Sequence, residues 1–282
     1  MRGWVALVAL GIGVAAGLAL VSSSDARRKP AAANVRALQG VNFVSNCRFS
    51  HRLPDDPIVS PQRPGTSHDH SFVGNTTTNA FSTRASLLRG SSTCRRAGDS
   101  AAYWMPTLLV NGQAVEPLGA TIYYRRRTLD PVRAFPPAFK MIAGHAHATS
   151  AQDLRVTFWN CGAAAGIRPS STVPTCPETR MTSLRLHINF PSCWDGKSRD
   201  SADHQSHTAY PMRGRCPSTH PVAVPAISLI YRYPLTGGPG VTLASGSQYS
   251  AHADFFNAWR QPALVSLVDG CLNALRHCGR GT

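Results

Sequence analysis

The densest group of side chains able to do chemistry lies between residues 184 and 221. A loop in this segment holds two cysteines, three aspartates, three histidines, a tryptophan and a tyrosine. Histidine and aspartate serve as general acids and bases and as metal ligands. A loop this rich in polar groups is a poor core and a good place for a site. We therefore predict a functional site here.

A strand leads into this loop. Its alternating apolar row is Leu184, Leu186, Ile188 and Phe190. Because side chains alternate along a strand, His187 and Asn189 should project from the opposite face.

One hypothesis is a glycan-active hydrolase, which needs two carboxyl groups flanking the scissile bond. The chain has only two glutamates, Glu116 and Glu178, so aspartates would have to act. The predicted catalytic residues are Asp195, Asp203, His204, His207 and Asp254. The alternative for Asp195 is a structural turn, since Asp-Gly is itself a turn signal.

A second hypothesis is a histidine site for zinc or copper. The chain has two His-x-His pairs, at His68/His70 and His145/His147, and two such residues share one face of an extended segment. These four residues are the predicted metal ligands, provided that both pairs face one cavity.

The 184–221 segment offers a second histidine set. His204 and His207 are three residues apart, and His187 and His220 flank them. They could bind zinc or copper, or one could act as a general base. The alternative is that such histidines only form hydrogen bonds with backbone carbonyls.

A third hypothesis is a non-catalytic module that binds carbohydrate or cell wall. For either glycan hypothesis, the predicted substrate-binding residues are His68, His70, Trp104, His187, Asn189, Trp194, Lys197, Tyr210, His220, His252 and Trp259.

The charge balance predicts the class of partner. The formal net charge is +15, from 29 Lys+Arg and 14 Asp+Glu. The arginines are scattered rather than gathered in a helix or arm, which argues against nucleic acid. We expect a monomer that meets extracellular polysaccharide, anionic wall polymers or a membrane surface.

The N-terminus predicts export. Residues 1–26 combine Arg2, an uncharged apolar run over 4–21 and a small-residue tail, as in a signal peptide. The apolar run could instead remain as a membrane anchor. Residues 27–40 are expected to form a linker and residues 41–282 a single domain.

An even number of cysteines in an exported chain predicts disulfides. Pairing the eight cysteines by proximity gives Cys47–Cys94, Cys161–Cys176, Cys193–Cys216 and Cys271–Cys278. There is no Cys-x-x-Cys motif to favour a zinc-thiolate site.

Short strands between Gly- and Pro-rich turns predict an antiparallel β-sandwich or jelly roll with few helices. Asn111-Gly112 predicts a hairpin turn. Helices are expected near 83–89 and over 261–274. In the 154–161 strand, Leu154, Val156 and Phe158 are expected on the buried side. Pro225 predicts an edge strand or a bulge.

Several sequence motifs, taken together and in their order along the chain, are similar to those of a known family. They are HxHSFxGN (68–75), YWMPTL (103–108), NFPSCWDGK (189–197), DSADHQSHTAYP (200–211), CPSTHPV (216–222) and HADFFNAW (252–259). Together they resemble a domain of unknown function from secreted bacterial and fungal proteins, in fungi often joined to WSC-type carbohydrate-binding modules. The resemblance implies an extracellular setting and a link to glycans, and transfers no catalytic role.

Overall fold

The computed structural model describes residues 1, 3, 35–166 and 168–280. The predicted signal peptide or anchor, and the predicted linker up to residue 34, lie outside the described residues apart from residues 1 and 3. The described residues from 35 onward belong to one compact unit. No helix within the described ranges has the length and apolar character needed to span a membrane.

Two large sheets build this unit. The six-stranded sheet has the order β17 (His277–Arg280), β1 (Asn42–Cys47), β7 (Gly119–Arg125), β14 (Ala226–Arg232), β10 (Arg185–Asn189) and β9 (Thr157–Asn160). The five-stranded sheet has the order β2 (Phe49–Leu53), β3 (His70–Gly74), β4 (Ala102–Pro106), β16 (His252–Phe256) and β8 (Lys140–Gly144). All neighbouring strands are antiparallel except β1 and β17.

The main core lies between the two sheets. Tyr103 and Phe255 from the five-stranded sheet and Ile122 and Leu229 from the six-stranded sheet belong to one buried apolar cluster. The Tyr231 hydroxyl donates across the interface to a backbone carbonyl of the other sheet at 3.0 Å. The predicted antiparallel β-sandwich is confirmed.

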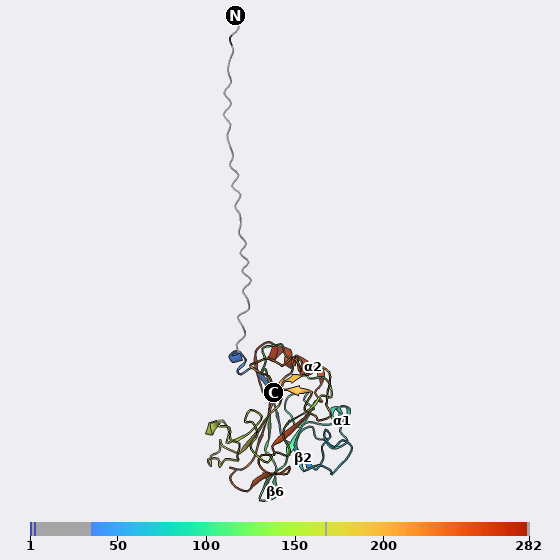
Figure 1. Cartoon of the computed structure of the whole chain (residues 1–282), viewed down its shortest axis with the longest axis vertical. Helices are drawn as coiled ribbons and strands as arrows, with labels where there is room; N and C mark the ends of the chain where they lie inside the picture. The colour runs from blue at the N-terminus through green and yellow to red at the C-terminus, as the bar shows by residue number, and fades with distance from the viewer. Residues whose placement is uncertain (2, 4–34, 167, 281–282) are drawn as a thin grey trace. The chain divides into compact units, whose positions relative to one another are not determined.

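Smaller elements complete the unit. They are two three-stranded sheets, β12 (Thr208–Ala209)–β11 (Cys193–Trp194)–β13 (Val222–Ala223) and β15 (Val241–Leu243)–β5 (Leu108–Val110)–β6 (Gln113–Val115), and the helical segments η1 (Val35–Leu38), α1 (Arg84–Arg89), η2 (Ala163–Ala165), α2 (Gln261–Leu267) and η3 (Val268–Asn273). Helix α2 and the β5–β6 hairpin lie at opposite ends of the domain (Figure 1).

Local sequence signals explain several of these elements. Asn111 and Gly112 both have positive φ, at 49° and 79°, and connect β5 to β6 as predicted. Thr83 caps α1 by accepting from the Ser86 amide at 3.2 Å.

A second buried cluster covers the outer face of the five-stranded sheet. Ile58, from the Pro-rich excursion between β2 and β3, and Leu87, from α1, pack against Phe72, Trp104 and Phe256. Because of this cover, polar residues on the same outer face are buried rather than exposed.

Four disulfides staple the unit. They join the four pairs expected from proximity, Cys47–Cys94, Cys161–Cys176, Cys193–Cys216 and Cys271–Cys278. Such bridges persist in oxidising compartments and are typical of extracellular proteins.

Two expectations about strand positions are wrong. Leu154 is 41% exposed and lies before β9, whereas Trp159 is the residue of that strand that is buried in the main core. The alternation is therefore displaced by one residue, so that Phe158 faces outward. Pro225 lies just before β14, a central strand, so it marks neither an edge strand nor a bulge.

Candidate metal centre

Three of the predicted site residues meet on the outer face of the five-stranded sheet. His70 begins β3, His252 begins β16, and β4 lies between these strands. His68 lies in the loop just before β3. His70 and His252 are buried and His68 is half-buried. The residues that cover this sheet face thus enclose the histidine side chains as well as apolar ones.

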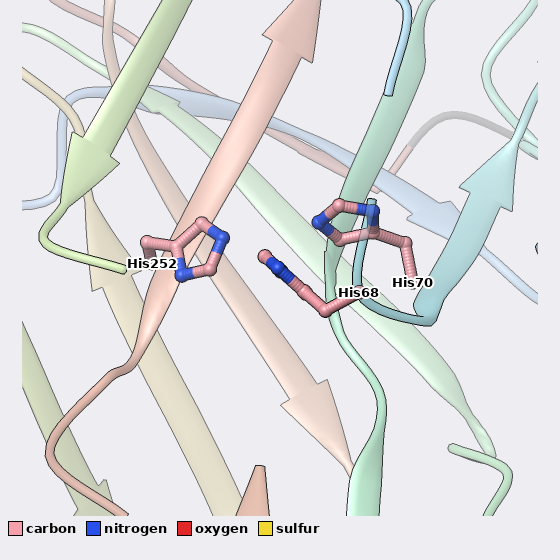
Figure 2. Close-up of side chains that lie close together, drawn as sticks. All are labelled: His68, His70 and His252. Atoms are coloured by element: carbon pink, nitrogen blue, oxygen red, sulfur yellow. The ribbon is translucent and has the colours of Figure 1, made fainter. Parts of the chain in front are cut away.

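The three imidazole rings lie close together, tilted or edge-on to one another. The ring of His68 lies between the other two (Figure 2), with its centroid 4.2 Å from that of His70 and 5.0 Å from that of His252. One nitrogen from each ring lies within 4.8 Å of the other two. This spacing would let one ion contact all three.

Hydrogen bonds fix the outer two rings. His70 Nδ1 lies 3.0 Å from the Asp55 carbonyl oxygen, and His252 Nδ1 lies 2.9 Å from the Ser250 carbonyl oxygen. A carbonyl only accepts, so each Nδ1 carries the proton and each Nε2 keeps its lone pair. Orientation of this kind is usual for histidines that bind metals. Nε2 of His68 and of His70 are buried without a hydrogen-bond partner.

Burial keeps these histidines neutral. Desolvation lowers the pKa of His252 to about 3, and desolvation with the nearby His68 charge lowers the pKa of His70 well below its usual value. Desolvation also lowers the pKa of His68. A neutral imidazole can bind a cation without first losing a proton.

Two carboxyl groups adjoin the rings. Asp254 follows His252 on the same face of β16 and is fully buried, with no partner for either carboxyl oxygen. One oxygen each from Asp56 and Asp254 and one nitrogen of His70 lie within 4.8 Å of one another. Burial, together with the charge of Asp56, raises the pKa of Asp254 well above its usual value. A buried carboxyl group without partners is costly, and a bound cation would remove that cost.

Asp56 is the residue that sequence reasoning missed. Its Oδ1 accepts from the amides of Ile58 and Val59 at 2.8 and 2.9 Å, which holds the carboxylate against the sheet. In the sequence it reads as a turn residue in a Pro-rich excursion. The signal was its place within the connection that returns to His68 and His70.

The second His-x-His pair stays outside this cluster. His145 and His147 follow β8, are exposed, and have ring centroids 6.1 Å apart. Nδ1 of His145 lies 3.1 Å from the His147 amide, so it accepts a local hydrogen bond. The charge of His147 helps to lower the pKa of His68, but neither His145 nor His147 belongs to a described group close enough to hold a metal ion.

The histidines of the 200–220 loop have hydrogen-bond partners. His207 is buried, with Nδ1 2.8 Å from the Ser201 hydroxyl and Nε2 2.7 Å from the Lys140 carbonyl. His220 contacts a neighbouring threonine hydroxyl and a backbone carbonyl, each at 2.9 Å. His204 Nδ1 pairs with Asp200 at 2.7 Å. These contacts tie the loop to itself and to β8.

The aspartates of that loop shape its turns. Asp195 accepts from the amides of Lys197 and Ser198 at 2.7 and 2.9 Å. Asp203 accepts from the Ser201 hydroxyl, at 2.6 Å, and from backbone amides, and these hydrogen bonds hold its pKa well below the usual range. Among the described residues, neither belongs to a group close enough to hold a metal ion.

The predicted aromatic residues divide by burial. Trp104 and Trp259 are fully buried, so neither presents a ring to a sugar. Trp104 lies opposite Asp254 in register and has no partner for Nε1, whereas Trp259 donates to Tyr124 at 2.9 Å. Trp194 is half-buried and donates to the Ser198 carbonyl.

The remaining predicted residues lie elsewhere. Asn189 and Tyr210 line a cavity of about 810 Å³ on the outer face of the six-stranded sheet. His187 lies on the same face, stacked on Phe158. Lys197 is exposed in the loop after β11.

The chain belongs to a family described as Domain of unknown function (DUF1996), whose match spans residues 56–259. That range begins at Asp56 and includes the other four residues of the cluster, His68, His70, His252 and Asp254. Comparison with curated proteins and with solved structures gives no match.

Proposed function

We propose that this chain is an exported protein that binds a divalent transition metal, zinc in the first instance, through His68, His70 and His252. The observation that carries the proposal is the set of three converging ring nitrogens, with two of the rings oriented by backbone carbonyls. Three imidazoles with a nearby carboxylate suit zinc, and imidazole also suits copper.

Asp254 and Asp56 have complementary roles in this proposal. Asp254 balances the cation's charge. Asp56 is already held by two amides, and one of its oxygens lies within 4.8 Å of a His70 nitrogen and of an Asp254 oxygen. His68, the half-buried member, forms the side from which an ion or a small ligand would enter. A bound zinc would supply Lewis acidity and an activated water.

A second candidate is glycoside hydrolysis, supported by the approach of Asp56 and Asp254 within 4.8 Å. Paired carboxyl groups with separated pKa values are the requirement for that reaction, and the pKa of Asp254 is raised. In this form Asp254 is the acid, and Asp195 and Asp203 take no part. A non-catalytic wall-binding module is the alternative if neither test below gives metal or activity.

Metal content tests the first proposal. We expect near-stoichiometric zinc or copper, measured by mass spectrometry, in mature protein purified without a His tag or chelator. We expect none in the His68→Ala/His70→Ala/His252→Ala variant. The matched control is His145→Ala/His147→Ala, which removes the exposed His-x-His pair and should keep the metal.

The same preparations separate the two candidates. Metal-free wild type that takes up no zinc or copper in titration would contradict the metal proposal. Metal-free protein that cleaves a wall glycan, and loses this activity in Asp254→Asn and in Asp56→Asn, would establish the carboxyl pair instead.

A further inference from the structure

A second feature lies on the opposite side of the sandwich, on the outer face of the six-stranded sheet. Alternation along β7, β14 and β10 sends Arg125, Arg232 and Arg185 outward, away from the core. Arg48 and Arg95, from neighbouring loops, line the same surface. We call these five residues the arginine face.

Two of these arginines face each other directly. Arg185 and Arg232 are paired in register across β10 and β14. Like charges directly opposite on adjacent strands destabilise a sheet. Gly162 leaves the space for this arrangement, because a Cβ there would come within 2.5 Å of the Arg185 guanidinium. A cost of this kind is offset when an anion lies between the two guanidinium groups.

No carboxylate of the described chain performs that role. None of the ion pairs found among residues 35–166 and 168–280 involves a member of the arginine face. Nε of Arg125 and of Arg185 are buried without a hydrogen-bond partner. Arg125 stacks on Tyr123, 4.2 Å from the ring centroid, which holds its guanidinium in place.

The surface is hollowed along its length. A cavity of about 340 Å³ is lined by four members, Arg48, Arg95, Arg185 and Arg232. The larger cavity of about 810 Å³ follows it along β14, since Ile230 lines the first and Ser228 the second. The two hollows therefore share one sheet face.

The linings of the two hollows differ in chemistry. The larger one presents Asn189, Ser228 and the Tyr210 ring, groups that suit sugar hydroxyls and ring faces. Its Asp153 is neutralised by Arg155. The smaller one presents guanidinium forks, which match carboxylates in bidentate pairs.

We propose that this face binds an acidic polysaccharide. Carboxylates of the chain pair with Arg185, Arg232 and their neighbours, and the adjoining sugar rings lie over Ser228 and Tyr210. The site is separate from the histidine cluster, which lies on the outer face of the other sheet.

Binding of polygalacturonate by the intact mature protein tests this, with calorimetry at low salt and neutral galactan as the uncharged comparison. Arg185→Gln/Arg232→Gln should weaken binding about tenfold or more, as expected for central charged anchors. The control Arg89→Gln/Arg133→Gln removes the same charge from two exposed arginines that line neither hollow. It should change affinity by less than about twofold.

Three results would overturn the proposal. Absence of binding by wild type at low salt would reject an acidic ligand. An equal loss in the control variant would show that only net charge matters. Polyphosphate bound as tightly through the same two arginines would show that the ligand is any polyanion rather than an acidic polysaccharide.

A further variant separates this site from the metal proposal. We expect His70→Ala/His252→Ala to bind polygalacturonate as the wild type does.

Discussion

Two histidine-rich regions of this molecule behave in opposite ways. In the 200–220 loop, His207 and His220 have a hydrogen-bond partner at each ring nitrogen. In the cluster on the outer face of the five-stranded sheet, His70 and His252 are held only through Nδ1. The first region uses histidine as a structural link, whereas the second brings three imidazole nitrogens within 4.8 Å of one another.

The difference teaches that density of polar residues in sequence is a weaker sign of a site than unpartnered atoms in the fold. Buried polar groups are almost always hydrogen-bonded, so a buried exception needs an explanation. Among the described residues, four of the twelve buried exceptions, Nε2 of His68 and of His70 and both oxygens of Asp254, belong to this one cluster.

The largest expected effect is on zinc affinity, when one histidine from each region is replaced by alanine. His252→Ala removes one of three ligands and should weaken zinc binding roughly a hundredfold or more. His207→Ala should leave the affinity unchanged. Competition with a chelator of known affinity measures both, and equal losses would erase the contrast between the regions.

Stability should show the reverse order. His207→Ala removes the imidazole that contacts the Lys140 carbonyl, and it leaves the Ser201 hydroxyl with Asp203 as its remaining side-chain partner. We expect it to lower the free energy of unfolding by about 2 kcal/mol in urea denaturation. His252→Ala in metal-free protein serves as the comparison. An unchanged midpoint for His207→Ala would show that its hydrogen bonds do not hold the loop.

The comparison extends to buried carboxyl groups, because Asp99 has partners where Asp254 has none. Asp99 accepts from Ser45 at 2.6 Å and from Tyr103 at 3.0 Å, yet burial raises its pKa to about 7. A carboxyl group whose pKa is raised on folding stabilises the fold below its unfolded pKa, near 3.8. That contribution is lost as pH rises through 7.

The unfolding free energy should therefore fall over this window by at most about 1.4 kcal/mol per pH unit because of Asp99. Asp99→Asn should flatten that slope. Denaturation at a series of pH values checks it, and an identical slope in the variant would mean that Asp99 stays ionised throughout.

The smallest effect is expected at His204. Its contact with Asp200 is partly exposed, with side-chain exposures of 22% and 28%. His204→Ala should cost no more than about 1 kcal/mol and leave metal content intact. Loss of metal from His204→Ala would instead indicate a metal site in the 200–220 loop.

Local patterns predicted much of the fold. Alternation placed His187 and Asn189 opposite the apolar row of β10, Asn111-Gly112 marked a hairpin, and proximity gave the cysteine pairs. The error at Leu154 arose because period-two alternation gives no register by itself. A shift of one residue exchanges the two faces of a strand.

The candidate centre was only partly predictable. His68 and His70 were visible as a pair, but His252 and Asp254 come from a strand distant in sequence. Only the strand order β3–β4–β16 brings them together. Asp56 was hidden among turn residues, because nothing in a short sequence window shows that the excursion folds back over the sheet.

X-ray absorption at the zinc edge, on tag-free mature protein loaded with one equivalent, tests the central claim most directly. We predict three imidazole nitrogens near 2.0 Å with an oxygen ligand, and loss of one imidazole in His70→Ala. A shell of oxygens alone, or one unchanged in His70→Ala, would contradict a metal centre at His68, His70 and His252.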